Sequence, residues 1–341
     1  MPQFETETPE GLRRFLRGEG TGKVPCTVGI NGRVWDQDPE RFERLVEEAP
    51  DVHVVASRDP SRAEEHTWTD PWGCLWRFPG DYLDGQVIGH PLADWDAFAG
   101  YTPPDPAEHR DWDAFARDAE QKRQAGKVVS GGLPHGFLYL QLTYLRGFSG
   151  FMMDLAERRP EAEVLRDMVA DYYVEVVRRY LRAGADLIGA GDDLGHQTAL
   201  PMSPGMWRDF LKPAFARIFA PCREAGAVVR LHTDGFILPI IGDLIEIGVD
   251  SLNPQDLVNG LENLEKLAKG KLCIDLDIDR QSVTAFGTPE QIDAHIRECI
   301  QTLGSPGGRL TLIFGAYPGT PVENVARVAL SMQQYHDIWA S

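Results

Sequence analysis

The 341-residue sequence lacks paired cysteines, a long apolar run and an excess of positive charge. Its five cysteines stand singly, without a CxxC pair, so neither a disulfide framework nor a cysteine-pair metal site is expected. No apolar stretch approaches the roughly 20 residues of a membrane-spanning helix. The acidic start, MPQFETETPE, has no basic segment followed by an apolar one, which argues against a signal peptide. These absences predict a cytoplasmic protein that does not enter a membrane.

The charge balance excludes another class of partner. Thirty-four lysine and arginine residues face 52 acidic ones, which gives a formal net charge of −18. The basic residues are dispersed along the chain, so no patch offsets the repulsion of a phosphate backbone. We therefore expect no nucleic acid partner, while a hydrophobic fraction of 43% is typical of a globular domain.

Strand and helix patterns alternate to the end of the chain without a linker. Residues 26–30 and 52–57 read as the first strands, residues 127–132 as a strand closed by two glycines, and residues 161–183 as a helix with apolar residues at a period of 3.6. This rhythm predicts an α/β fold, a single (β/α)8 TIM barrel over residues 1–341. Residues 1–24 would form an extended N-terminal region, and residues 60–110 would include lid-like insertions.

The stretch 227–253, AVVRLHTDGFILPIIGDLIEIGVDSLN, organises the expected site. It reads as a strand, a loop, a helix and the next strand. Alternation along a strand places Arg230, His232 and Asp234 on one face. The carboxyl ends of parallel strands are where α/β proteins place their chemistry, so this face predicts a polar cavity.

Other predicted strands end in polar residues, which a barrel would bring to the same mouth. We expect catalytic roles for His232, Asp234 and Asp193, and a tentative divalent metal on His232 and Asp234. The expected substrate-binding residues are Asp192, Gln197, Arg230, Asn253, Asp277, Trp72 and Trp76.

Several of these residues could have a structural role instead of a functional one. Asp192 and Asp193 could equally serve as helix caps, because an Asp after a strand commonly does so. Asp275 and Asp279 are expected to serve structure. In the aromatic segment 66–78, HTWTDPWGCLWRF, a packed hairpin is the simpler interpretation, and a pocket wall formed by Trp72 and Trp76 is the alternative.

Several motifs together resemble the uroporphyrinogen decarboxylase superfamily, which includes tetrapyrrole decarboxylases and corrinoid-linked methyltransferases. They are TDPWGCLW, PLADWDAF, AGADLIGAGDDLGHQ, SPGMWRDFLKP, HTDGFILPIIGDLIEIGVDSLNP and PGTPVENV. The resemblance implies a β/α barrel. Two departures concern the site. The Arg-Gln-Ala-Gly-Arg-Tyr segment of the decarboxylases is missing near the start. The zinc-binding His-x-Cys of the methyltransferases reads His232-Thr233-Asp234, and Ala316 stands where a later cysteine is expected.

The resemblance favours the methyltransferase-like branch. It implies transfer of a methyl group between a small methylated substrate and a corrinoid or other acceptor. The alternatives are decarboxylation of a porphyrinogen-like or smaller carboxylate, and a noncatalytic ligand-binding barrel. The candidate partners are a small-molecule substrate, a corrinoid protein and a second copy of the chain in a homodimer.

Overall fold

The computed structural model describes residues 8–340, so the first seven residues of the expected N-terminal extension lie outside the described part. Its contacts divide the chain into two compact units. The first unit contains Met1–Glu64, Gly80–Leu83 and Ser251–Ser341, and the second contains Glu65–Pro79 and Asp84–Asp250. Each unit contains a sheet of parallel strands together with helices, which places the chain in the α/β class. The expectation of a single domain over residues 1–341 stays a prediction.

Five parallel strands form the sheet of the first unit. Their order across the sheet is β2 (Val52–Ser57), β1 (Cys26–Asn31), β11 (Leu310–Ala316), β10 (Cys273–Asp277) and β9 (Ser251–Pro254). The helices of this unit are α2 (Pro9–Arg17), α3 (Gly32–Trp35), α4 (Pro39–Glu48), η1 (Pro60–Arg62), α12 (Asp256–Asn259), α13 (Leu261–Leu267), α14 (Val283–Phe286), α15 (Pro289–Leu303) and α16 (Val322–Tyr335).

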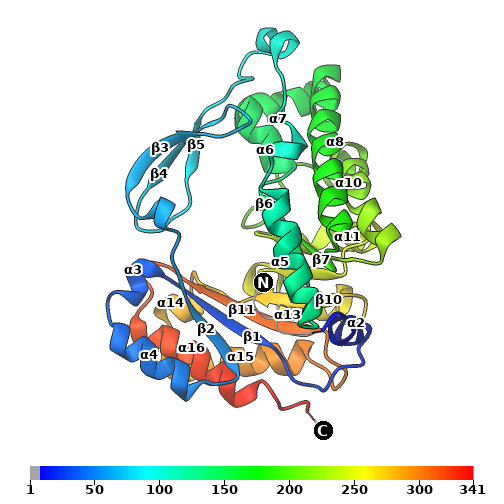
Figure 1. The fold of residues 1–341 in the computed structure, drawn as a ribbon. Helices are drawn as coiled ribbons and strands as arrows, with labels where there is room; N and C mark the ends of the chain where they lie inside the picture. Colours follow the sequence, from blue (N-terminus) through cyan, green and yellow to red (C-terminus); the bar gives the residue numbers. More distant parts are fainter. Residues whose placement is uncertain (1–7, 341) are drawn as a thin grey trace. The chain divides into compact units, whose positions relative to one another are not determined.

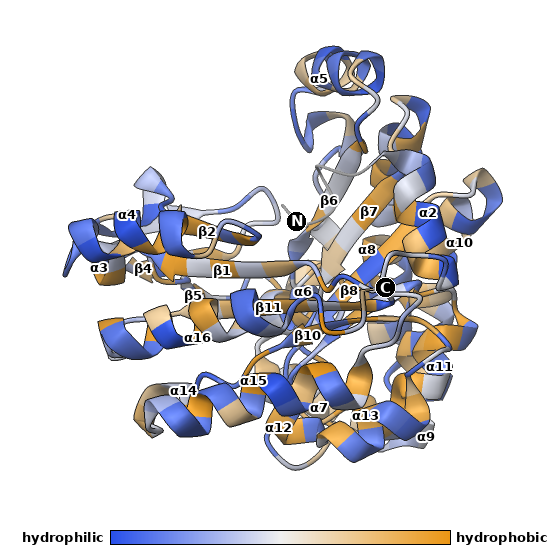
Figure 2. Ribbon diagram, turned by 90° about the horizontal axis from the view of Figure 1, so that it is seen from below, coloured by the Kyte–Doolittle hydropathy of each residue, from blue (hydrophilic) through white to orange (hydrophobic). Residues whose placement is uncertain are grey.

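Helices α4, α15 and α16 lie along one face of this sheet (Figure 1). Hydrophobic and hydrophilic residues alternate along α15 and α16, as expected for helices with one buried side (Figure 2). Helix α15 begins with a capping box, in which Thr288 and Gln291 satisfy backbone N–H groups of the first turn. The core of the unit therefore lies between the sheet and these amphipathic helices.

The second unit has three parallel strands in the order β8 (Val228–Thr233), β7 (Leu187–Gly191) and β6 (Ser130–His135). A separate antiparallel sheet contains β3 (Glu65–Thr69), β4 (Leu75–Pro79) and β5 (Gln86–Gly89). The helices are η2 (Trp95–Gly100), η3 (Pro106–Glu108), α5 (Trp112–Gln124), α6 (Tyr139–Arg146), α7 (Phe148–Glu157), α8 (Pro160–Arg182), α9 (Pro204–Met206), η4 (Trp207–Leu211), α10 (Lys212–Ala225), η5 (Leu238–Ile240) and α11 (Ile241–Glu246). Helices α8 and α10 pack side by side (Figure 1).

Most predicted elements are confirmed, with one informative difference. The strands expected at 26–30 and 52–57 are β1 and β2, and the helix expected at 161–183 is α8. The strand expected at 127–132 instead spans Ser130–His135. Its two glycines do not end it, because the pairing with β7 continues to His135. Gly131 instead provides room for the ring of Tyr180, since an added Cβ would come within 2.7 Å of that ring.

The eight parallel strands, five in one unit and three in the other, are consistent with a fold like the expected TIM barrel. Among residues 8–340, no helix combines the length and apolar character needed to cross a bilayer.

Candidate active site

Three neighbouring strands of the second unit bring two histidines together. In the parallel register, His135 of β6 is level with Gly191 of β7, and Gly191 is level with His232 of β8. Side chains at the same level of a parallel sheet point to the same face. His135 and His232 therefore stand on one face of the sheet, at the carboxyl ends of their strands, with a glycine between them.

Gly191 makes this pairing possible because it has no side chain. A Cβ at this position would lie 2.8 Å from Cδ2 of His135 and 3.6 Å from Cδ2 of His232. The first distance is below any ordinary contact of a Cβ atom, so a side chain would displace the His135 ring. With glycine present, the two imidazole rings lie 5.5 Å apart between centroids.

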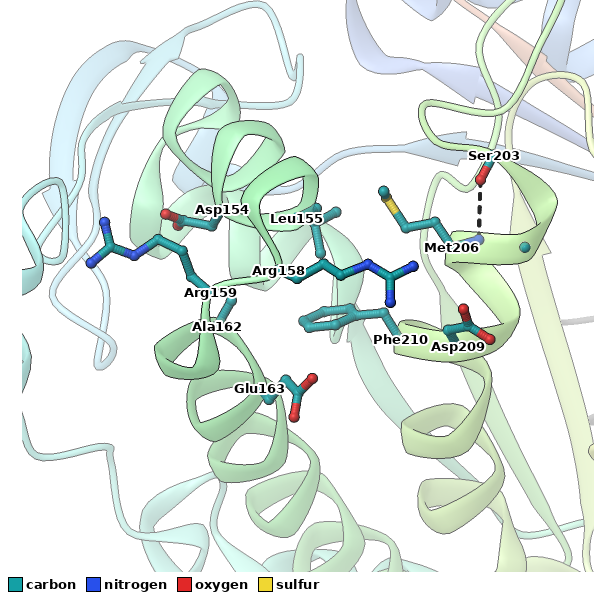
Figure 3. A pocket seen from close by; sticks show the side chains of 11 residues that line it. Asp154, Leu155, Arg158, Arg159, Ala162, Glu163, Ser203, Met206, Asp209 and Phe210 are labelled. Atoms are coloured by element: carbon teal, nitrogen blue, oxygen red, sulfur yellow. Dashed lines mark hydrogen bonds between the residues drawn. The ribbon is translucent and has the colours of Figure 1, made fainter.

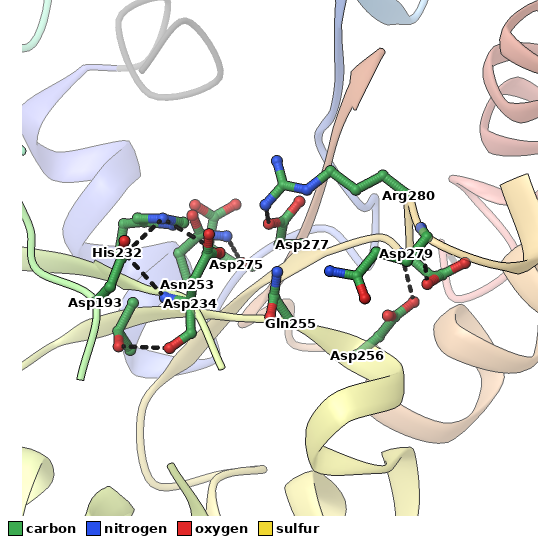
Figure 4. Close-up of polar contacts among 12 residues, drawn as sticks. Asp193, His232, Asp234, Asn253, Gln255, Asp256, Asp275, Asp277, Asp279 and Arg280 are labelled. Atoms are coloured by element: carbon green, nitrogen blue, oxygen red, sulfur yellow. Dashed lines mark hydrogen bonds and ion pairs between the residues drawn. The ribbon is translucent and has the colours of Figure 1, made fainter. Parts of the chain in front are cut away.

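Two carboxylates complete the His/Asp cluster, which we define as His135, Asp193, His232 and Asp234. Nε2 of His135 lies 3.0 Å from Oδ1 of Asp193, and Nε2 of His232 lies 3.8 Å from the same oxygen. Nε2 of His232 is also 3.5 Å from Oδ1 of Asp234. Figure 4 shows the contacts of His232 with Asp193 and Asp234. The predicted residues Asp193, His232 and Asp234 are thus brought together.

The residues of the His/Asp cluster shift one another's pKa values. Burial alone would lower the pKa of His135, but the hydrogen bond and charge of Asp193, with help from Asp192 and Asp234, raise it. Burial would raise the pKa of Asp193, but His135 and His232 lower it. Each member of the His135–Asp193 pair therefore stabilises the charged form of the other.

The same atoms form a set of metal donors. Nitrogen atoms of His135 and His232 and an oxygen of Asp193 all lie within 4.8 Å of one another. Two imidazoles and a carboxylate suit a divalent cation of the zinc or iron type, without a thiolate. His135 is 50% exposed at its side chain and His232 is 22% exposed, so a ligand can reach them from solvent. The donor set therefore fits a divalent metal.

The loops that carry Asp193 and Asp234 pack closely against each other at Gly195 and Gly235. A Cβ on Gly195 would lie 2.5 Å from the backbone nitrogen of Phe236, and one on Gly235 would lie 2.2 Å from Gly195. The backbone N–H of Gly195 donates to the carbonyl of Asp234 at 3.2 Å. This close approach fixes the spacing of the two acidic residues.

Asp192 has a different role from its neighbour. Its side chain is completely buried, and its carboxylate accepts hydrogen bonds from the backbone N–H groups of Leu138, Tyr139 and Leu140. These are the first amides of α6, which have no partner inside the helix. Burial raises the pKa of Asp192 to about 7, although the amides of Tyr139 and Leu140 favour its charged form. Of the two alternatives for Asp192, the geometry supports the helix cap.

The aromatic segment forms the expected hairpin, in which Trp68 pairs with Trp76 across β3 and β4. Trp72, at its turn, is buried against Tyr172 and Tyr173 of α8, with ring centroids 4.8 and 6.2 Å away. This geometry supports packing for Trp72. Trp76 is half-buried and meets the ring of Tyr144 edge-on at 4.9 Å, so it stays the candidate for a pocket wall.

The remaining predicted residues of the second unit differ in exposure. Gln197 lies on an exposed loop, while Arg230 is buried two positions before His232 in β8. Cys74 lies in the hairpin, directly before β4. It is completely buried, and burial together with Asp70 raises its pKa, which disfavours a thiolate.

The first unit holds the other predicted residues, at the ends of β9 and β10. Asn253 is buried and donates through its amide to the carbonyl of Asp275. The carboxylate of Asp275 accepts from Thr311 at 2.5 Å, which supports its structural role. Asp277 is buried and binds the guanidinium of Arg280 at 2.6 Å (Figure 4). The positive charge of Arg280 is thus balanced by the carboxylate of Asp277.

A buried pair anchors α15 in the first unit. Nε2 of His295 lies 2.7 Å from Oδ2 of Asp256, and both side chains are less than 10% exposed. The same carboxylate oxygen accepts from the backbone of Asp279 at 3.1 Å. Burial would lower the pKa of His295, but Asp256 outweighs it and raises the pKa. Asp279 itself caps the turn before α14 through the amides of residues 281–283.

Sequence reasoning missed His135. It stands directly before Gly136, which has a φ of 78°, just as Asp234 stands before Gly235 with a φ of 83°. A polar residue followed by a left-handed glycine at the end of a strand is the signal that links the two positions.

Comparisons with known proteins agree with this architecture. The solved structure of a methyltransferase from Methanosarcina mazei matches with a TM-score of 0.67 and 19% identity, over 96% of this chain and 99% of that one. This likeness shows a shared fold. A uroporphyrinogen decarboxylase from Parasynechococcus marenigrum (strain WH8102) is 28% identical over 92% of this chain and 93% of its own length. A protein of the same name from Synechococcus sp. (strain CC9605) is 29% identical, but the match spans only 46% of its length. Residues 87–335 match the family described as Uroporphyrinogen decarboxylase (URO-D), and since this is more than half of the sequence, the chain belongs to that family.

Proposed function

We propose that the protein is a methyltransferase that moves a methyl group from a small methylated substrate to a corrinoid or another acceptor. The observation that carries the proposal is the His/Asp cluster, in which two imidazoles and two carboxylates gather around the sheet face over Gly191. The reaction type is that of the Methanosarcina mazei methyltransferase, whose fold this chain shares.

The reaction needs activation of a heteroatom. The bond between the methyl carbon and the heteroatom breaks, an electron pair of the acceptor forms the new bond to carbon, and the heteroatom takes up a proton. His135 is suited to supply this proton because Asp193 stabilises its imidazolium form. His232 at the end of β8 and Asp234 just after it orient the heteroatom.

A divalent cation is the second means of activation that the cluster allows. Nε2 of His135, Oδ1 of Asp193 and Nε2 of His232 would hold it, and the cation would polarise the heteroatom as a Lewis acid. Asp193 serves in both cases, because its oxygen faces both imidazoles.

The test is methyl transfer in solution. Purified protein is mixed with cob(I)alamin and, in turn, methanol, methylamine, methanethiol and a methoxyarene, and formation of methylcobalamin is followed by absorbance. We expect one donor class to react, and the His232→Ala variant to be about 100-fold slower. His196→Ala, in an exposed loop, is the matched control and keeps full activity. Absence of methyl transfer from all four donors would count against the proposal.

Decarboxylation is the second candidate, because the relative that matches over 92% of the chain bears that name. A substrate with several carboxylates needs several cationic side chains. In the first unit, Arg280 is already paired with Asp277, which weakens this reading. Release of carbon dioxide from uroporphyrinogen by the wild-type protein, with no methyl transfer, would favour it.

A further inference from the structure

A second cavity lies away from the His/Asp cluster, in the second unit. It has a volume of about 270 Å³ and lies between the junction of α7 and α8 on one side and α9 with the π-helical turn η4 on the other. No residue of the His/Asp cluster lines it. Pockets for drug-sized ligands begin at about 300 Å³, so this cavity suits a smaller molecule.

Arg158 projects into this cavity from the end of α7. Its backbone has φ 54° and ψ 48°, the left-handed conformation in which glycine is usual at a helix end. A residue with a side chain adopts this conformation only at a cost in free energy. Figure 3 shows the guanidinium of Arg158 directed across the cavity toward Met206 and Asp209. Within residues 8–340, its side chain forms neither an ion pair nor a hydrogen bond.

Asp209 supplies the opposite charge from the facing wall. It lies in η4, and its carboxylate likewise has no ion pair or hydrogen bond among the described residues. π-helical turns are often found at functional sites, where the extra residue redirects side chains. Here the turn places Asp209 and the ring of Phe210 on the cavity wall.

Leu155, Met206 and Phe210 form an apolar part of the wall between the two charges, and Glu163 adds a second carboxylate to the lining. Helix α9 is held by a hydrogen bond from the backbone N–H of Met206 to Oγ of Ser203 at 3.1 Å (Figure 3). A free cation, a free anion and an apolar surface between them match a molecule that carries both charges and an aliphatic body. A simple anion would be repelled by Asp209, and a simple cation by Arg158.

We infer that this cavity binds a small zwitterion with an apolar body, of the α-amino acid class, with its carboxylate on Arg158 and its ammonium on Asp209. The site is independent of the proposed methyl transfer, since it shares no residue with the His/Asp cluster.

The experiment is calorimetric titration of the full chain with L-leucine, L-leucinamide and N-acetyl-L-leucine. Wild-type protein should bind leucine, and each derivative should bind about tenfold more weakly because it lacks one charge. Arg158→Gln should bind leucinamide as well as leucine, because the carboxylate has lost its partner. Asp209→Asn should likewise lose its preference for leucine over the N-acetyl derivative.

Arg159→Gln is the matched control. Arg159 is the adjacent arginine and also borders the cavity, but its guanidinium lies 3.5 Å from Glu161 and points away from Arg158 and Asp209 (Figure 3). This variant should bind all three compounds as the wild type does. Met206→Trp, which fills the cavity, should abolish binding. Failure of the wild type to bind leucine at millimolar concentration, or binding that Arg158→Gln and Asp209→Asn leave unchanged, would overturn the inference.

Discussion

The imidazole rings of His135 and His232 face each other across a single glycine, with their centroids 5.5 Å apart. They come from strands β6 and β8, which are not adjacent, and Gly191 of β7 lies between them at the same level. The missing side chain at Gly191 is therefore as much a part of the site as the two histidines.

Replacement of Gly191 by alanine should separate the two rings. The new Cβ would lie 2.8 Å from the His135 ring, which must move away from Asp193. We expect methyl transfer to fall by about 100-fold, since small misplacements of reacting groups have effects of this size. Gly132→Ala is the control, because a Cβ there has no neighbour nearer than 3.9 Å. Equal activity of the two variants would show that the His135 position is not required.

Metal content should depend on the histidines and not on the cysteines. If the protein binds a divalent cation, elemental analysis should find it in the wild type and in Cys74→Ser, because Cys74 is buried and its raised pKa disfavours the thiolate. His135→Ala and His232→Ala should each lose it, while the exposed His196→Ala should keep it. Metal that is lost with Cys74 would instead restore a thiolate site. A protein that is metal-free in every preparation would leave activation to the proton of His135.

Asp192→Ala should destabilise the protein through helix α6. The change leaves buried N–H groups at the start of the helix without an acceptor, which costs about 2 kcal/mol. Asp111→Ala removes an exposed cap of α5 and should cost about half as much. Urea denaturation measures both. Full stability of Asp192→Ala with impaired turnover would instead point to the substrate-binding role.

The pair of His295 and Asp256 should make stability depend on pH. Because the folded-state pKa of His295 is raised, its contribution is present below its unfolded pKa of about 6.5 and is lost as the pH rises through the folded value. His295→Gln should remove this fall in stability on the alkaline side. It should also destabilise the protein by about 3 kcal/mol at pH 6, since Asp256 is left buried without its cation. Parallel denaturation curves of both proteins between pH 6 and pH 9 would contradict this assignment.

Local patterns were enough to predict much of the fold. The period of 3.6 identified α8, because this signal depends on residues close in sequence. Strand alternation also placed His232 and Asp234 on one face, where they lie 3.5 Å apart. These are properties of single elements, which a short stretch of sequence specifies.

The partners of His232 depend on distant segments and were harder to predict. His135 follows two glycines and Pro134, which suggest the end of a strand, yet β6 resumes its pairing with Gly191 after a shift in register. Asp192 and Asp193 are adjacent in sequence. Only the position of α6 determines that Asp192 caps this helix while Asp193 contacts His135. Such assignments require the register between strands, which local periodicity does not contain.

The first unit is assembled from both ends of the chain, because β1 pairs with β11 and Cys26 is level with Leu312. On the ribosome, β1 and β2 emerge early and must wait for nearly the entire polypeptide before their neighbour β11 exists. The strands β6, β7 and β8 are all synthesised before Asp250, so their sheet can form while the first unit is still unfinished. Biosynthesis therefore favours completion of the sheet that bears the histidines first, and a ribosome stalled before residue 310 should carry this sheet folded and the N-terminal strands exposed.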